Sequence, residues 1–352
     1  MAAMTMPSPS RRAMLRVLAA SGLAAASPVA AQERSAVLAS ARREGKVALA
    51  TSAPAAGFPR FLNAFIAKYP FIDATGGLYS APTGRVLARV HAEIKARALS
   101  FDVLHVASLA AYLAHARTGR LLQYRSPELA AYPPEAHDGG WWTTARIVGV
   151  IMAYNKNVLP PAEAPKAWAD LLRPAFKGRK IIIQDSAAGT SFNQMYLLEK
   201  RLGREFMVKW GEQQPIVVST AAQVIDMLVR GEAVLGATVD HYRAFEPHAV
   251  AAGIVGVYPS EGMPLATAPI AILKDAPHPN AARLFVDYAL SEEGQNLLDA
   301  DVFNVYSMRQ GARTPAGQLP LADTKALLPT DFADYEAAAE KFPETFDRYF
   351  NP

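Results

Sequence analysis

The sequence predicts an α/β fold with two lobes, each built on a mostly parallel sheet with helices on its faces. Three observations predict it. Short apolar runs alternate with segments whose apolar residues have helical spacing. This strand–helix order occurs in two successive sets, as expected for α/β domains. A segment rich in proline and glycine, residues 124–144, separates the sets, and 352 residues suffice for two cores.

The first set contains three strand–helix units. The apolar run 47–50 predicts the first strand, and Phe58, Phe61 and Phe65 lie on one face of the helix that follows. The other elements expected in this set are strands at 72–79 and 101–106, and helices at 83–98 and 109–117. We expect this set to form the first lobe, residues 32–140, which a later segment, residues 265–320, completes.

The second set repeats the same order. Ile181, Ile182 and Ile183 are consecutive and apolar, as expected of a strand that is buried on both faces. The expected strands are 148–154, 180–184, 216–219, 233–239 and 266–273, and the expected helices are 168–172, 190–202, 221–230, 280–300 and 331–346. We expect residues 141–264 and 321–352 to form the second lobe.

The N-terminus has the organisation of an export signal. Arg11 and Arg12 precede an apolar run of about 13 residues, which is too short to span a membrane. Small residues at Ala30 and Ala31 then offer a cleavage site. The paired arginines resemble a twin-arginine signal, although Met14 stands where that pattern usually has phenylalanine. We expect residues 1–31 to be removed, which leaves a soluble protein in the periplasm.

Charge and composition exclude several functions. The net charge of +4 comes largely from Arg11, Arg12 and Arg16; without residues 1–31 the chain has 33 basic and 32 acidic residues. The mature chain therefore lacks the basic surface typical of nucleic-acid binding. The chain has no cysteine, which excludes disulfides, thiolate metal sites and cysteine nucleophiles.

The candidate binding residues follow the ends of strands. In an open parallel sheet the ligand crevice lies outside the carboxyl ends of the strands. Residues at these positions are mostly small, hydroxylated or glycine, so that backbone N–H groups at helix N-termini can reach an anionic ligand. Each could alternatively be a simple helix cap. The candidates are Ser52, Ala53, Ser80, Thr83, Ser108, Asp185, Gly189, Thr190, Ser191, Asp240 and Tyr242.

Motifs of catalysis are missing. The chain has no Walker loop, no dinucleotide-binding glycine pattern, no His-Glu-x-x-His and no Gly-x-Ser-x-Gly. The seven histidines are scattered without a carboxylate at metal-ligand spacing. We therefore expect no catalytic residue, no resident metal and no cofactor.

Four segments stand in a recognisable order. They are a strand with a Tyr-Asn pair in residues 149–156, a Pro, Trp, Asp-Leu-Leu, Lys-Gly run in 165–180, an Ala-Pro-x-Pro-x-Ala-Ala turn at 276–282, and residues 285–295. Together they resemble the solute-binding proteins of ABC transporters, in the cluster of ferric-iron binders and their organic-anion-binding relatives. The resemblance implies a type II periplasmic-binding fold, with hinged lobes that close on a ligand and deliver it to an inner-membrane permease. We expect a monomer.

The sequence departs from the iron binders of this family. They use an early histidine, an acidic residue and two adjacent tyrosines, whereas this chain has His241-Tyr242 at the tyrosine pair. A ferric ion with one phenolate would be under-ligated. We therefore expect a small anion bearing phosphate, phosphonate or carboxylate, with Tyr242 as a hydrogen-bond donor. The alternatives are a ferric-iron binder that uses His241 and Tyr242, and a secreted α/β hydrolase or transferase.

Overall fold

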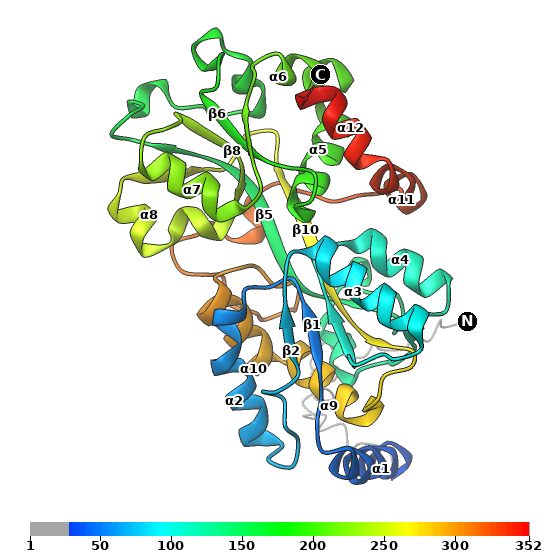
Figure 1. Cartoon of the computed structure of the whole chain (residues 1–352). Helices are drawn as coiled ribbons and strands as arrows, with labels where there is room; N and C mark the ends of the chain where they lie inside the picture. Colours follow the sequence, from blue (N-terminus) through cyan, green and yellow to red (C-terminus); the bar gives the residue numbers. More distant parts are fainter. Residues whose placement is uncertain (1–27, 352) are drawn as a thin grey trace, which may run out of the picture.

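The computed structural model describes residues 28–351 and shows one mixed sheet that runs through two bodies (Figure 1). The strands follow the order β2 (Leu78–Ser80), β1 (Leu49–Thr51), β3 (Val103–His105), β10 (Met263–Leu273), β5 (Thr143–Asn155), β8 (Leu235–Asp240), β6 (Ile181–Gln184), β7 (Ile216–Val218). Three short strands extend it: β4 (Leu121–Leu122) and β11 (Ala326–Leu327) pair with β10, and β9 (Ile254–Val257) pairs with β5. The predicted two-lobed α/β fold is confirmed.

The sheet is parallel at its two ends and antiparallel at its centre. β1, β2 and β3 are parallel to one another, as are β6, β7 and β8. β10 and β5 run antiparallel to each other, β10 also to β3 and β5 also to β8, because the chain leaves one body through β5 and returns through β10. The prediction of a mostly parallel sheet therefore fails at these two long strands. Their ladder has a register shift between Ala268 and Pro269.

The lower body in Figure 1 contains strands β1 and β2 and helices from two separate parts of the chain. Its helices are α1 (Pro28–Glu44), α2 (Phe58–Lys68), α3 (Thr83–Ala96), α4 (Leu109–Arg117), α9 (Pro279–Leu290) and α10 (Glu292–Gln295). The apolar face of α2 packs on α9, where the rings of Phe61 and Phe285 lie 5.7 Å apart. The predicted helix 280–300 is interrupted because the Ser291 hydroxyl accepts a hydrogen bond from the N–H of Gly294 and starts a new helix, which continues as a π-helix (Asn296–Phe303).

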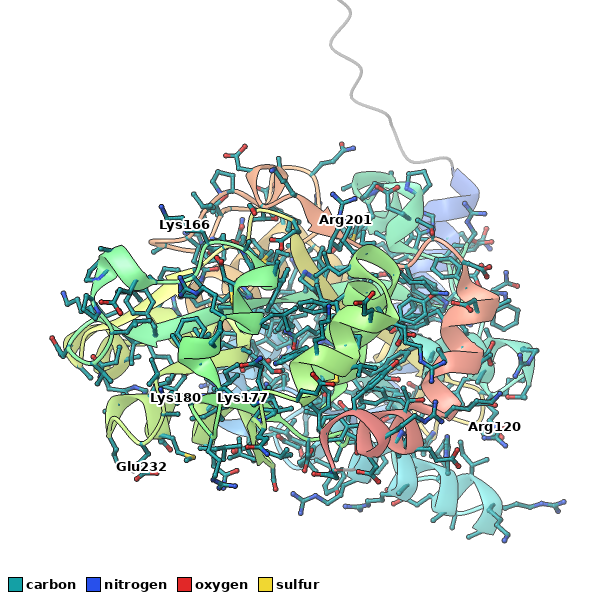
Figure 2. All side chains as sticks on the ribbon, turned by 90° about the horizontal axis from the view of Figure 1, so that it is seen from above. Arg120, Lys166, Lys177, Lys180, Arg201 and Glu232 are labelled. Carbon is teal, nitrogen blue, oxygen red and sulfur yellow. The ribbon has the colours of Figure 1, made fainter. Side chains whose placement is uncertain are left out.

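The upper body in Figure 1 contains strands β6 and β8 and a second set of helices. Its helices are α5 (Gly189–Leu202), α6 (Arg204–Gly211), α7 (Ala221–Val229), α8 (Pro247–Ala251) and α12 (Phe342–Phe350). Its core contains two fully buried tryptophans, Trp168 and Trp210, and the ring of Phe350 on α12 lies 5.2 Å from that of Trp210. Charged side chains such as Lys166, Lys177 and Glu232 remain exposed on the outside of this body (Figure 2).

Helix α11 (Phe332–Glu340) lies between the two bodies (Figure 1). Toward the lower body, Glu336 pairs with Arg117 of α4 at 2.8 Å. Toward the upper body, the buried Tyr335 hydroxyl donates a hydrogen bond of 2.8 Å to the side chain of Asn193 on α5. The C-terminal segment therefore links the two bodies in addition to β5 and β10.

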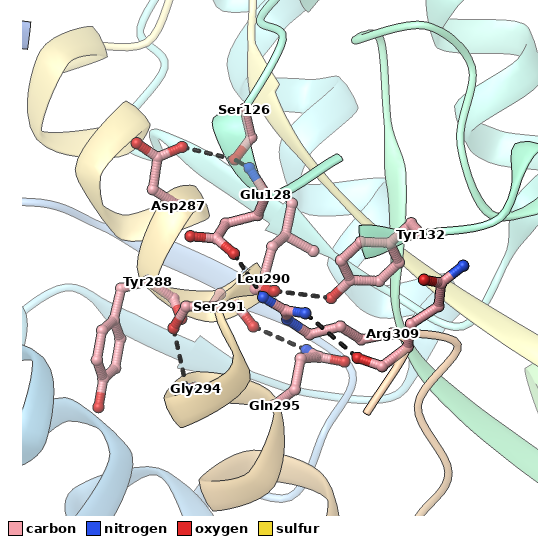
Figure 3. A network of polar contacts seen from close by, with 12 residues as sticks. Ser126, Glu128, Tyr132, Asp287, Tyr288, Leu290, Ser291, Gly294, Gln295 and Arg309 are labelled. Carbon is pink, nitrogen blue, oxygen red and sulfur yellow. Dashed lines mark hydrogen bonds and ion pairs between the residues drawn. The ribbon is translucent and has the colours of Figure 1, made fainter. Parts of the chain in front are cut away.

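A polar network fixes the irregular segment after β4 to the lower body (Figure 3). Ser126 donates to Asp287 at 2.7 Å, and Tyr132 donates to the carbonyl of Leu290 at 3.0 Å. The amide of Gln295 donates to the carbonyl of Ala145, near the start of β5, at 2.9 Å. The start of β5 is thereby held against α9 and α10.

Several predicted elements differ in extent. The predicted strand 72–79 shrinks to β2 because Asp73 accepts a hydrogen bond from the Thr75 N–H and forms a turn. Helices α1, α6 and α8 were not predicted. The predicted export signal lies almost entirely outside the described residues. Within residues 28–351, no helix combines the length and apolar character that a membrane crossing requires.

Candidate functional site

A cleft of about 640 Å³ opens between the two bodies at the strand ends. It contains eight of the eleven predicted residues: Ser52, Ser80, Thr83, Asp185, Gly189, Thr190, Asp240 and Tyr242. Ser80 comes from the lower body and Thr190 from the upper body, so both bodies contribute walls. The structure thus brings together residues that are up to 190 positions apart in the chain, although their binding of a ligand stays a prediction.

The other three predicted residues do not line this cleft. Ala53 is fully buried, and its carbonyl accepts the Ser80 hydroxyl at 2.7 Å. Ser108 is the N-cap of α4, with its side chain accepting from the N–H of Ala111. Ser191 is buried in the first turn of α5 and donates to the carbonyl of Gln184. These three residues take part in hydrogen bonds within the local structure. Ser108 is a helix cap, as the alternative interpretation of the sequence predicted.

The lower wall of the cleft is organised by short side chains. The Ser52 hydroxyl accepts a hydrogen bond of 3.0 Å from the N–H of Ala107, which ties the end of β1 to the loop after β3. Pro82 precedes Thr83 at the start of α3, and fixes the direction in which this helix begins. The N-terminus of α3 therefore points its unpaired N–H groups at the cleft.

The upper wall touches the lower one at Gly189. This glycine is the first residue of α5, and a Cβ atom built on it would lie 2.3 Å from the carbonyl oxygen of Ala107 and 3.3 Å from the Thr83 hydroxyl. Carbon and oxygen atoms that do not bond stay above about 3 Å, so only glycine permits this approach of the two bodies. Gly189 therefore has a steric role at the edge of the cleft.

Three arginines in the cleft were missed by the sequence analysis: Arg85, Arg146 and Arg243. Arg85 lies in the first turn of α3 and is exposed, whereas Arg146 is buried in β5. Arg243 follows Tyr242 directly, and its guanidinium lies 5.1 Å from the centre of the Tyr242 ring. With Asp185 and Asp240 as the only carboxylates among the described lining residues, the cleft carries a net positive charge.

Asp240 is the buried carboxyl group of the cleft. It ends β8 with 9% of its surface exposed, and Gln184 donates to its Oδ1 at 3.3 Å. Burial raises the pKa of Asp240 above its ordinary value, while Arg243, the Thr190 hydroxyl and Gln184 oppose the rise. The group is thus desolvated and positioned next to positive charge.

Tyr242 and His241 are adjacent but serve different places. Burial, reinforced by Asp240, raises the pKa of Tyr242 to about 12, so its hydroxyl is a neutral donor in the cleft. The His241 ring is fully buried and stacks on Tyr306 at 4.6 Å, with Nδ1 3.0 Å from the N–H of Gly149. Burial lowers the pKa of His241 to about 3, and the residue is a neutral core histidine outside the cleft lining.

The cleft contains groups that can pair with an anion. In the part of the chain that the structure describes, no three histidine, aspartate or glutamate side chains gather closely enough to hold a metal ion. The cleft instead offers guanidinium groups, hydroxyls and helix N-termini, which are the partners of phosphate and carboxylate.

The fold and cleft define a two-bodied ligand-binding protein. The chain belongs to the family of bacterial extracellular solute-binding proteins, whose profile matches residues 106–334. The protein is accordingly a solute-binding protein and not an enzyme, which removes the hydrolase or transferase alternative. An uncharacterised protein of Haemophilus influenzae is 30% identical over 193 residues, 51% of this chain and 53% of that protein. The chain thus spans about half the length of this relative.

Solved structures share the fold at low identity. The periplasmic binding protein AfuA of Actinobacillus pleuropneumoniae, with exogenous fructose-6-phosphate bound, has a TM-score of 0.75 and 22% identity, and the match covers 87% of this chain and 99% of AfuA. Iron-bound HitA of Pseudomonas aeruginosa has a TM-score of 0.74 and 22% identity, with 86% and 99% covered. These similarities establish the fold.

Proposed function

We propose that the protein is the periplasmic solute-binding component of an ABC importer, and that it captures a small anion bearing phosphate, phosphonate or carboxylate. The solute would then pass to the permease in the inner membrane. The proposal includes export by the N-terminal signal, of the twin-arginine type, and a monomeric mature protein. We also propose that residues 32–140 and 265–320 form one lobe, and that residues 141–264 and 321–352 form the other.

The observation that carries the proposal is the charge of the cleft. Arg85, Arg146 and Arg243 line a space of about 640 Å³ together with Asp185 and Asp240. Three guanidinium groups and the N-terminus of α5 favour an anion over a neutral or cationic solute. The fold neighbour AfuA, whose structure contains fructose-6-phosphate, is in line with an anionic ligand of this size.

Ferric iron is the second candidate, favoured by the iron-bound state of the fold neighbour HitA and by Tyr242 in the cleft. The form of this alternative that uses His241 as a ligand is disfavoured by the buried, stacked position of that ring. An iron site here would combine the Tyr242 phenolate with Asp240 and a bound anion. Forming a phenolate at neutral pH would have to overcome the raised pKa of Tyr242.

A ligand screen with matched variants tests the proposal. Purified mature protein is titrated with phosphate, phosphonates, carboxylates, fructose-6-phosphate and ferric salts, and thermal stability is followed. A ligand at a hundredfold its dissociation constant adds about 2.7 kcal/mol of stability. Arg243→Gln should weaken anion binding about 10- to 150-fold, since a hydrogen bond to a charged group contributes about 1.5–3 kcal/mol.

Arg201→Gln is the matched control, because Arg201 is an exposed arginine at the opposite end of α5 from the cleft. It removes the same charge and should leave anion affinity unchanged. A visible absorption band on addition of ferric salt, without any anion-induced stabilisation, would instead support the iron candidate.

A further inference from the structure

We propose that Asp240 makes the cleft selective for anions that also offer a hydrogen-bond donor, such as hydroxylated or partly protonated oxyanions, and excludes fully ionised oxyanions such as sulfate. This inference rests on the proposed anion-binding function and adds a chemical requirement to the ligand. It concerns a carboxyl group in a cleft that otherwise favours negative charge.

The position of Asp240 is what requires an explanation. A carboxylate is an unfavourable neighbour for an anion, yet Asp240 lines the cleft at the end of β8 and is nine-tenths buried. One of its oxygens accepts from Gln184, whose amide also donates to the carbonyl of Thr238 at 3.0 Å. The side chain is therefore held in place by a second buried residue.

The ionised form of Asp240 is a hydrogen-bond acceptor. Burial raises the pKa of Asp240, but Arg243 and Arg146 favour the ionised form, as do the Thr190 hydroxyl and the Gln184 amide. A ligand bound between these arginines lies beside the carboxylate. It must either donate a hydrogen bond to the carboxylate or place two acceptors against each other in a site with little water, which is strongly unfavourable.

Phosphate and sulfate distinguish a ligand that can donate a hydrogen bond to Asp240 from one that cannot. They have the same tetrahedral shape, but near neutral pH phosphate carries at least one hydroxyl and sulfate carries none. Sites built to bind a ligand hydroxyl reject analogues that lack it by large factors, because the protein group is left unpaired. Wild-type protein should therefore bind phosphate, or the hydroxyl-bearing fructose-6-phosphate, at least about 100-fold more tightly than sulfate.

The test compares both anions in three proteins by isothermal titration calorimetry at neutral pH and equal ionic strength. Asp240→Asn keeps the size of the side chain and replaces one acceptor by a donor, so the preference should fall to within about tenfold through tighter sulfate binding. Asp275→Asn is the matched control. Asp275 is an exposed aspartate that does not line the cleft, and its replacement should leave the preference unchanged.

Each result decides the inference. A wild-type protein that binds sulfate as tightly as phosphate would overturn it without any variant. An unchanged preference for phosphate over sulfate in folded Asp240→Asn protein would also overturn it. Asp240 would then only balance the positive charge of the arginines. If no anion of the panel binds wild-type protein, the proposed function itself is wrong, and the inference falls with it.

Discussion

Gly189 gives the most direct test of how the two bodies meet. Replacing it by alanine adds one methyl group, which would lie 2.3 Å from the carbonyl oxygen of Ala107 in the opposite body. The contact is with backbone, so no side chain can rotate away, and the bodies would have to separate by about 1 Å to restore normal contact. Alanine is otherwise compatible with the first turn of α5.

The expected magnitude follows from the cost of overpacking. Forcing an extra methyl group into a packed contact costs about 1–3 kcal/mol. If the bodies can part, only the closed conformation bears this cost, and ligand affinity should fall about 5- to 150-fold. The stability of the ligand-free protein should change little, since Gly→Ala also reduces the freedom of the unfolded chain.

The assay is isothermal titration calorimetry with the ligand that the screen identifies, together with small-angle X-ray scattering for closure. Gly84→Ala is the matched control: Gly84 also lines the cleft near the N-terminus of a helix, but a Cβ atom there would meet nothing within 4 Å. Equal affinities for wild-type protein and Gly189→Ala would refute the reasoning, because the two bodies would then not need this close approach to hold a ligand.

Three further predictions concern α11, buried histidine and export. Tyr335→Phe leaves the Asn193 side-chain oxygen without its buried donor, and urea denaturation should show a loss of about 1–3 kcal/mol in the free energy of unfolding; no loss would mean that α11 does not bind the upper body through this contact. The pKa of His241 in the folded protein, about 3, lies below its ordinary value of 6.5, so the unfolded chain takes up a proton first as the pH falls. The contribution of His241 to the free energy of unfolding is therefore complete above pH 6.5 and is lost as the pH drops toward 3. Between pH 7.5 and 5 this residue should account for about 2 kcal/mol, and His241→Asn should show a correspondingly weaker pH dependence in urea titrations, whereas identical dependence would place the titration elsewhere. Changing both Arg11 and Arg12 to lysine should hold the precursor in the cytoplasm on cell fractionation, while Arg16→Lys should not; export of the double variant would indicate the ordinary secretory route.

The order of elements could be predicted from sequence because apolar spacing records which faces are buried. Helices with a strong apolar stripe, such as α3 and α7, begin and end close to their predicted residues. Helix α6 was missed because it directly follows α5 across Gly203 and has only eight residues. Strand β5 was predicted too short because its first residues, Thr143 to Arg146, are largely polar although they are buried.

The candidate site shows a similar limit. Strand-end residues were accessible to prediction because parallel strands end at a common edge. Arg146 was not, since it lies inside β5 and faces the cleft only because that strand crosses between the bodies. Arg243 could have been found, because it follows Asp240 to Tyr242 directly. Which serines serve as caps depends on side-chain direction, which spacing does not record.

The register shift between Ala268 and Pro269 bears on how a molecule with an unbroken central sheet could bend. Proline has no backbone N–H, so the ladder between β10 and β5 already lacks a rung there. Flexing at that point therefore stretches fewer main-chain hydrogen bonds than bending within the regular parts of the two strands. This gap in the ladder lies where the chain passes from one body to the other.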